Sequence, residues 1–147
     1  MIVRAAIRED IPAMMRLANH SATAAHWSRA QYDRVFDAVP RRLALVIEEV
    51  AVLKGFLIVQ EVASEWEIEN LAVADAARRR GLGTRLLGEF LNRVRQAGAA
   101  AVYLEVRESN RAARSLYEKW AFVESGRRRG YYSQPVEDAI VYRLSFL

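Results

Sequence analysis

The spacing of apolar and polar residues changes several times along the chain, and each spacing predicts a type of element. The first stretch, Ile2–Ile7, is predicted to form a strand. Asp10, followed by Pro12, has the composition of a helix start. The helix after it would bury one apolar side, made of Met14, Met15, Leu17 and Ala18.

A second helix is predicted shortly afterwards. Ser28 and Gln31 have the separation of a capping box, in which each side chain bonds the backbone N–H of the other residue. We expect this helix to run to about Val39, because Pro40 disfavours helical backbone in the residue before it.

Between residues 43 and 73 the pattern becomes that of strands. Segments 43–49, 52–62 and 65–73 are rich in Val, Ile, Leu and Phe and are joined by short gaps, which predicts a meander. Simple alternation divides the side chains of the third segment between two faces: Trp66, Ile68 and Asn70 on one, and Glu67, Glu69 and Leu71 on the other.

Helical spacing returns after residue 81 and predicts a long helix closed by Gly98. Its apolar stripe consists of Leu82, Leu86, Leu87, Phe90, Leu91 and Val94. A strand at 100–106, a short helix from Asn110 to about Trp120, and strands at 122–128 and 138–146 follow. The order β-α-α-β-β-β-α-β-α-β-β is that of an α/β protein. The strands on either side of the long helix should be parallel, joined by a right-handed crossover.

Length and composition narrow the class of protein. The 147 residues suit one domain, residues 1–147, which can bury a stable core without disulfides or a structural metal. The absence of cysteine excludes disulfides, thiolate metal sites and a cysteine acyl intermediate. With only His20 and His26, a histidine metal site or a Ser-His-Asp triad is not expected. No apolar run has transmembrane length and the first residues do not read as a signal peptide, so we expect a cytoplasmic protein without a membrane partner.

The chain is basic, with a net charge of +4, and arginine supplies most of the positive charge. A basic balance favours polyanionic partners such as nucleic acid, the ribosome or a phosphorylated cofactor. One hypothesis is therefore an RNA- or ribosome-binding module without activity. It requires a continuous basic face with interleaved aromatic residues. The arginines instead form two clusters, Arg78–Arg80 and Arg127–Arg129, so direct nucleic-acid binding is not expected.

The first arginine cluster belongs to the stretch ARRRGLGTRLL at 77–87, between a predicted strand and a predicted helix. Backbone N–H groups are unpaired at a helix start and the helix dipole is positive there. Gly81 and Gly83 would let a phosphate approach these amides closely. A Walker loop requires a lysine that is absent, and a dinucleotide fingerprint requires a third glycine where Leu86 stands. The pattern that fits is Arg78-x-x-Gly81-x-Gly83.

This pattern resembles the acyl-coenzyme A pyrophosphate loop of the GNAT N-acetyltransferases, and the resemblance extends over essentially the whole chain. More narrowly, several stretches resemble the RimI-like branch, which acetylates the N-terminal alanine of a small-subunit ribosomal protein. These stretches are HWS (26–28), NLAV (70–73), LEVRESN (104–110), LYEKWAF (116–122), RRRGYY (127–132) and EDAI (137–140). The chain departs from that branch at Glu69 and in a shorter segment at 133–137.

The resemblance implies a GNAT fold and a co-substrate. The fold is a mixed, mostly antiparallel sheet of about seven strands with four helices, in which two parallel strands splay at a bulge. The co-substrate is acetyl-coenzyme A, used in direct transfer to an amine without a metal. Asn110 would bond the pantetheine arm, a role compatible with capping the helix that follows it. The implied coenzyme-binding residues are Leu71, Ala72, Val73, Arg78, Arg79, Arg80, Gly81, Leu82, Gly83, Thr84 and Asn110.

The resemblance also implies a base and an acid. Glu105, which projects opposite to Leu104 and Val106, is the expected base, unless it is only a solvated strand residue. Glu67 is the rival and would otherwise bind substrate or position water; Glu69 is a weaker candidate. Tyr117 is the expected acid for the coenzyme thiolate, unless it only packs inside the helix.

The acceptor is the least determined part of the prediction. Tyr131 and Tyr132, in a loop between the last two strands, would line a groove for the substrate N-terminus. Arg127–Arg129 would meet an acidic surface or form a solvated hairpin. A peptide α-amine is roughly 10–17% neutral at pH 7 and a lysine about 0.04%, so an α-amine needs only a modest base. A lysine side chain or a small-molecule amine is the alternative acceptor, and the sequence makes no prediction of oligomeric state.

Overall fold

Seven strands form one mixed sheet in residues 1–21, 23–74 and 81–146, the parts of the chain that this computed structural model describes. The strands are β1 (Ile2–Ala5), β2 (Arg42–Glu49), β3 (Val52–Val62), β4 (Glu65–Val73), β5 (Ala101–Arg107), β6 (Val123–Tyr132) and β7 (Glu137–Ser145). Their order in the sheet is β1-β2-β3-β4-β5-β7-β6, and β4–β5 is the parallel pair among antiparallel neighbours. The predicted fold class is confirmed.

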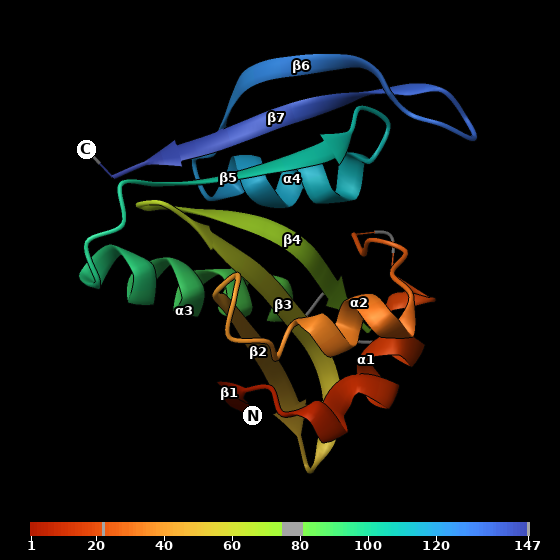
Figure 1. Ribbon diagram of the computed structural model, residues 1–147, viewed down its shortest axis with the longest axis vertical. Helices are drawn as coiled ribbons and strands as arrows, with labels where there is room; N and C mark the ends of the chain where they lie inside the picture. Colours follow the sequence, from red (N-terminus) through yellow and green to blue (C-terminus); the bar gives the residue numbers. More distant parts are fainter. Residues whose placement is uncertain (22, 75–80, 147) are drawn as a thin grey trace.

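Helices cover both faces of this sheet, as Figure 1 shows. The helices are η1 (Arg8–Asp10, a 3-10 turn), α1 (Ile11–Ala18), α2 (Arg29–Arg34), α3 (Leu82–Gln96) and α4 (Arg111–Lys119). The side chains of α1 and α2 pack on one face and those of α3 and α4 on the other. Two hydrophobic cores result, one on each side of the central strands.

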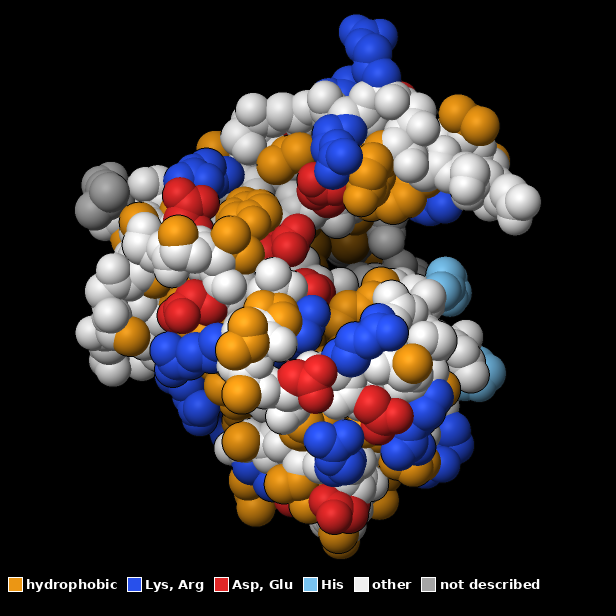
Figure 2. Space-filling view, in the orientation of Figure 1, with side chains coloured by type: hydrophobic (Ala, Val, Ile, Leu, Met, Phe, Trp, Pro, Cys, Tyr) orange, Lys and Arg blue, Asp and Glu red, His pale blue; other side chains and the backbone are white. Residues whose placement is uncertain are grey.

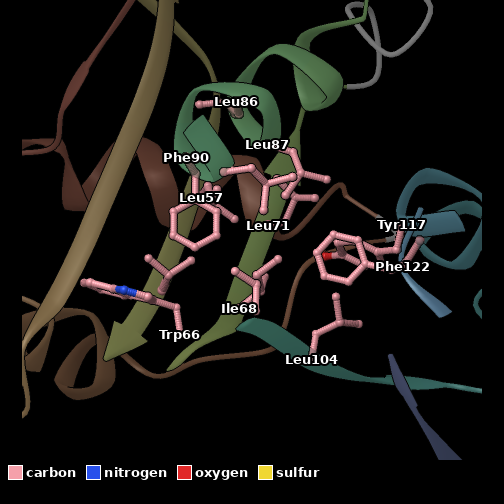
Figure 3. Packing of buried hydrophobic residues seen from close by; sticks show 14 of the residues in the cluster. Leu57, Trp66, Ile68, Leu71, Leu86, Leu87, Phe90, Leu104, Tyr117 and Phe122 are labelled. Carbon is pink, nitrogen blue, oxygen red and sulfur yellow. The ribbon is translucent and has the colours of Figure 1, made fainter. Parts of the chain in front are cut away.

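The core beneath α3 is the larger one. All six residues of the predicted α3 stripe are buried, with Leu86, Leu87 and Phe90 fully so. They meet Leu57 and Leu71 of the sheet (Figure 3). The stripe forms a helix here because its 3.6-residue spacing places every large apolar side chain over the sheet.

Two predicted boundaries are wrong. Helix α2 ends at Arg34 rather than near Val39, and β1 ends at Ala5 rather than at Ile7. Val39 is 84% exposed and Ile7 is 53% exposed, so neither element would bury apolar surface by extending to these residues. Burial, rather than the position of the next proline, determines these ends.

The bounds of β6 are also a correction. The strand predicted at 122–128 continues to Tyr132, so Tyr131 and Tyr132, which were expected in a loop, lie within β6. Arg127 and Arg128 pair with Ile140 and Ala139. Strand β6 is the exposed edge of the sheet, so its residues need no apolar alternation to be extended. The pairing is irregular after Arg128, and Gly130 there has a φ of 59°.

A bulge interrupts β4 and reverses its faces. Ile68 lies opposite Val59 and Asn70 lies opposite Ile58, which leaves Glu69 as the extra residue. Leu71 therefore joins Trp66 and Ile68 in the core beneath α3, whereas Asn70 bonds to Tyr32 on the α2 side. The face assignment by simple alternation is wrong for Asn70 and Leu71. The bulge that the resemblance implied is present.

Candidate active site

The two parallel strands separate and open a cleft in the sheet. β4 and β5 pair only where Glu65–Glu67 meet Ala101–Tyr103. Beyond this point the strands diverge (Figure 1), and a cleft of about 330 Å³ lies between them. Figure 2 shows a hollow on this side of the molecule, between the β6–β7 hairpin and the body that carries α1 and α2.

The cleft brings together five of the predicted site residues. Its walls include Leu71 from β4, Glu105 from β5, Asn110 and Tyr117 from the α4 region, and Tyr132 from the end of β6. Leu71 and Tyr132 come from elements further along the chain on either side of β5 and α4, and the splayed strands allow all five side chains to converge. A carboxylate and a phenol therefore line one cavity.

Glu105 is held by an arginine from the edge strand. On β5 the side chains of Leu104 and Val106 are buried in the core, and Glu105 projects to the other face, as predicted. Its oxygens accept hydrogen bonds of 2.9 and 3.2 Å from Nη1 of Arg128. The side chain of Glu105 is 22% exposed, so the ion pair lies at the rim of the cleft.

Two further carboxylates lie near Glu105. Glu69 lines the cleft and forms a 2.8 Å ion pair with Nε of Arg42. Glu67 is half-buried beside them and is not among the described residues that form the cleft wall. Burial raises the pKa of Glu67 above its ordinary value, and the negative charges of Glu69 and Glu105 raise it further. Glu67 thus holds a proton more readily than an ordinary glutamate does.

Tyr117 is buried and protonated. It is 4% exposed and packs edge to face on Phe122, with 5.6 Å between ring centroids. Burial raises the pKa of its phenol, so the hydroxyl keeps its proton at neutral pH. Figure 3 shows the ring reaching from α4 toward Leu71 and Leu104, the two sides of the cleft. The hydroxyl in this place therefore carries a proton at neutral pH.

Asn110 begins α4. Its side-chain oxygen accepts a hydrogen bond of 3.1 Å from the backbone N–H of Ala113, which is the cap that the sequence indicated. Asn110 also lines the cleft. Asn110 therefore caps α4 and lies at the cleft at the same time.

A second pocket, of about 220 Å³, lies at the start of α3. Gly81, Gly83 and Thr84 line it together with Val73. Gly81 has a φ of 72°, a backbone conformation that favours glycine, and its missing side chain leaves open space in front of the helix. The N–H groups in the first turn of a helix have no partner within that helix, so those of α3 are suited to a pyrophosphate. Arg78, Arg79 and Arg80 lie outside the described residues.

The edge of β4 between the two pockets offers main-chain groups. The carbonyl of Leu71 accepts a 2.7 Å hydrogen bond from Thr23, and the N–H of Val73 donates one of 3.3 Å to Ser21. Both main-chain groups point away from β3 and toward the pockets. A pantetheine arm that adds here as an extra strand would share the Leu71 carbonyl with Thr23 and replace Ser21 as the acceptor of the Val73 N–H. This arrangement fits the coenzyme that the resemblance implied.

Two of the predicted coenzyme residues do not contribute a side chain there. Ala72 is fully buried on the α1 side of the sheet. Ala74 bonds to Lys54 of β3, so Ala72, two positions earlier, also directs its main chain to β3. Leu82 is 1% exposed in the α3 core and can contribute only its backbone N–H.

The two tyrosines of the hairpin are in contact but differ in position. Their ring centroids are 5.1 Å apart, and Tyr132 lines the cleft while Tyr131 is 49% exposed outside it. Arg107 lies 4.4 Å from the Tyr132 ring centroid and bonds Glu137 at 3.2 Å. Arg107 therefore connects the hairpin to β5.

Several residues of this site carry no signal in the sequence. Ser21 and Thr23 hold the edge of β4, Arg42 pairs with Glu69, and Arg128 pairs with Glu105. No local pattern links residues 21–23 to 71–73, because only the tertiary fold brings them together. The second arginine cluster was expected to meet a partner or solvent, whereas Arg127 and Arg128 bond to carboxylates of this chain.

Acidic and histidine side chains do not gather into a metal site in the described part of the chain. Within residues 1–21, 23–74 and 81–146 no group of them has the required arrangement. None of the helices described here combines the length and apolar character needed to cross a bilayer.

Known proteins are similar to this chain in fold and in sequence. A profile of the acetyltransferase (GNAT) family matches residues 11–122. The ribosomal protein bS18-alanine N-acetyltransferase of Escherichia coli (strain K12) is 34% identical over 137 residues, which cover 92% of this chain and 90% of that protein. The enzyme of the same name from Haemophilus influenzae is 38% identical over 104 residues, 69% of this chain and 70% of that protein. The crystal structure of the Escherichia coli ribosomal-protein-S18-alanine N-acetyltransferase superposes with a TM-score of 0.88 at 32% identity, covering 98% of this chain and 92% of that one.

The family profile, the relatives and the superposed structure agree with the splayed strand pair described above, and the chain belongs to the GNAT acetyltransferase family. Members of this family use acetyl-coenzyme A as acetyl donor. The predictions of a RimI-like GNAT enzyme and of its co-substrate are confirmed.

Proposed function

We propose that this chain, acting as one domain over residues 1–147, transfers acetyl from acetyl-coenzyme A to the N-terminal α-amine of a protein. The first candidate acceptor is the N-terminal alanine of a ribosomal protein, because the relatives named above carry that activity in their names. The observation that carries the chemistry is that Glu105 and Tyr117 line one cleft at the splayed edge of β4.

The proposed reaction assigns one proton transfer to each residue. The neutral α-amine attacks the acetyl carbonyl, so that a C–N bond forms and the C–S bond breaks. Glu105 takes the proton that leaves the amine nitrogen, and Tyr117 gives its proton to the coenzyme sulfur. Main-chain groups of Leu71 and Val73 hold the thioester arm, and Asn110 bonds it further along. Glu67 positions the amine or a water molecule, and Tyr132 walls the acceptor groove with Tyr131 at its entrance.

The test is acetyl transfer from labelled acetyl-coenzyme A to matched peptides. One peptide begins with a free alanine and has the N-terminal sequence of the ribosomal protein, others begin with different residues, and one has a blocked N-terminus and a single internal lysine. The blocked form of the alanine peptide is the control. We expect label on the α-amine of the alanine peptide, located by mass spectrometry. Label on the lysine peptide, or on none of the peptides, would contradict the proposal.

A further inference from the structure

Three carboxylates lie around the acceptor side of the cleft, and two of them have arginine partners. Glu69 is paired with Arg42, and both side chains are well covered, at 16% and 14% exposed. Arg42 also bonds Gln60 at 3.2 Å and the carbonyl of Arg34 at 3.3 Å. The Glu69 pair is therefore fixed in the protein. The pair between Glu105 and Arg128 has a different character.

Arg128 reaches Glu105 from the far side of the β6–β7 hairpin. Strand β7 lies between β5 and β6, and its Val141 is opposite both Glu105 and Gly126. Because Gly126 has no side chain, Arg128 can extend across Val141 to Glu105. Arg128 uses a single nitrogen, Nη1, for both carboxylate oxygens. Its guanidinium lies 3.9 Å from the ring centroid of Tyr131.

The arginine side of this second pair lies at the surface. The side chain of Arg128 is 52% exposed and Tyr131 is 49% exposed. Arg128 bonds Glu105 through one nitrogen rather than in the two-nitrogen fork of the strongest arginine–carboxylate pairs. The arginine is thus a largely exposed cation placed at the expected base.

The charge of Arg128 affects two kinds of amine differently. A carboxylate has about four acceptor positions, so a neutral amine can hydrogen-bond to Glu105 while Arg128 stays in place. A protonated amine at the same carboxylate would bring two positive charges together, or would have to displace Arg128. At pH 7 roughly 10–17% of peptide α-amines are neutral, against about 0.04% of lysine side chains.

We propose that Arg128 is a specificity-determining residue that pairs with Glu105 and so favours neutral α-amines over protonated lysine side chains as acetyl acceptors. This inference rests on the proposed function, in which Glu105 receives the amine proton. It assigns the second arginine cluster a role at the acceptor site of its own chain. It also gives the contact between Arg128 and Tyr131 a purpose, which is to hold the cation over the rim of the cleft.

The test compares Arg128→Ala with the wild type and with two matched variants. Arg129→Ala removes an equal charge from the neighbouring exposed position, and Arg128→Lys keeps the charge without the planar guanidinium. Each protein receives saturating acetyl-coenzyme A and either the free alanine peptide or the N-blocked lysine peptide, and kcat/KM is measured for both. Thermal unfolding of all four proteins verifies that the fold is retained.

We expect Arg128→Ala to raise kcat/KM for the lysine peptide relative to the alanine peptide by about five-fold, the effect of a strong exposed ion pair. Arg129→Ala should leave this ratio unchanged and Arg128→Lys should keep it near the wild-type value. A purely structural role would lower both rates together and leave the ratio alone. An unchanged ratio in Arg128→Ala, with the alanine peptide still acetylated, would overturn this inference alone. A wild-type enzyme that prefers lysine, or acetylates neither peptide, would overturn the proposed function and this inference with it.

Discussion

Glu105 and Tyr117 line the same cleft from two elements that follow one another in the chain, β5 and α4. The carboxylate is tied to a surface arginine, and the phenol is buried with its pKa raised. In the proposed mechanism Glu105 accepts the amine proton while Tyr117 still holds a proton for the coenzyme sulfur.

Replacement of Glu105 by glutamine should lower kcat by roughly 10²-fold or more, because the amide cannot take the amine proton. The KM for acetyl-coenzyme A should change little, since Glu105 lies on the acceptor side. Steady-state kinetics with the alanine peptide measures both constants. Glu108→Gln is the matched control, because Glu108 follows the same strand but bonds Arg127 outside the cleft. A Glu105→Gln enzyme as fast as the control would leave Glu67 as the base.

Replacement of Tyr117 by phenylalanine should lower kcat by about 10²-fold, because the thiolate would leave without a proton donor. The ring and its contact with Phe122 would remain, so stability at neutral pH should be nearly unchanged. Tyr103→Phe, on β5 and outside the cleft wall, is the control. A variant that loses activity only by unfolding would speak against an acid role, and circular dichroism at the assay temperature distinguishes the two cases.

The state of Tyr117 also predicts a pH profile. Burial raises the pKa of Tyr117 above its ordinary value, so the phenol stays protonated through the alkaline assay range. The α-amine of the peptide loses its proton near pH 8. We therefore expect kcat/KM of the wild type to rise between about pH 6 and pH 8 and then to stay level to about pH 10. A fall between pH 8 and pH 10 would show that the acid has a lower pKa than its burial implies.

The regular parts of the fold could be predicted from the sequence, because burial follows local spacing there. The six-residue stripe of α3 and the bounds of β4 are as expected. The bulge at Glu69 could not be read from alternation, since one extra residue looks the same in sequence as a change of face. Because Glu69 is the extra residue, the side chain of Leu71 points into the core and the edge of β4 faces the cleft.

The residues around the site likewise include some that the sequence predicts and some that it does not. Glu105, Tyr117 and Asn110 were found because they stand in motifs shared with a family. The hydrogen bond from Thr23 to Leu71 and the pair of Arg128 with Glu105 join residues 48 and 23 positions apart. Such contacts depend on how strands are ordered in the sheet, which a single sequence does not specify residue by residue.

The raised pKa of Glu67 has a consequence for stability. The folded protein holds this proton more tightly than the unfolded chain, so its stabilising effect is present at pH values below the ordinary glutamate pKa. That effect is lost as the pH rises through the raised pKa. Glu67→Gln should therefore increase the free energy of unfolding at pH 7, by less than about 1 kcal/mol. The gain should shrink toward pH 4.

Glu65 provides the control of opposite sign on the same strand. Its oxygens bond Arg143 at 2.7 and 2.9 Å, and this hydrogen bonding lowers the pKa of Glu65. Its contribution is present above the ordinary glutamate pKa and lost as the pH falls. Glu65→Gln should thus decrease stability at pH 7. Urea unfolding of both variants at pH 7 and pH 4 measures the signs, and equal signs at pH 7 would contradict the assignment.

Gly55 packs against β4 close to Leu71 and Val73, the residues proposed to hold the coenzyme. A Cβ at this position would lie 3.1 Å from the carbonyl oxygen of Ala72 and 3.1 Å from Cδ1 of Leu86. Both are buried, so Gly55→Ala should cost about 1–3 kcal/mol of stability. The displaced carbonyl stands between Leu71 and Val73, and for this reason the KM for acetyl-coenzyme A should also rise.

Gly126→Ala is the matched substitution for this test, because its Cβ would be 3.9 Å from Val141, an ordinary contact on an exposed strand. Its free energy of unfolding should stay within about 0.5 kcal/mol of the wild type. Urea unfolding of the three proteins gives the stabilities, and coenzyme titration at fixed peptide gives the KM. If Gly55→Ala lost stability but kept its KM, the edge of β4 would be able to shift without disturbing the coenzyme, and Leu71 and Val73 would not be its main-chain partners.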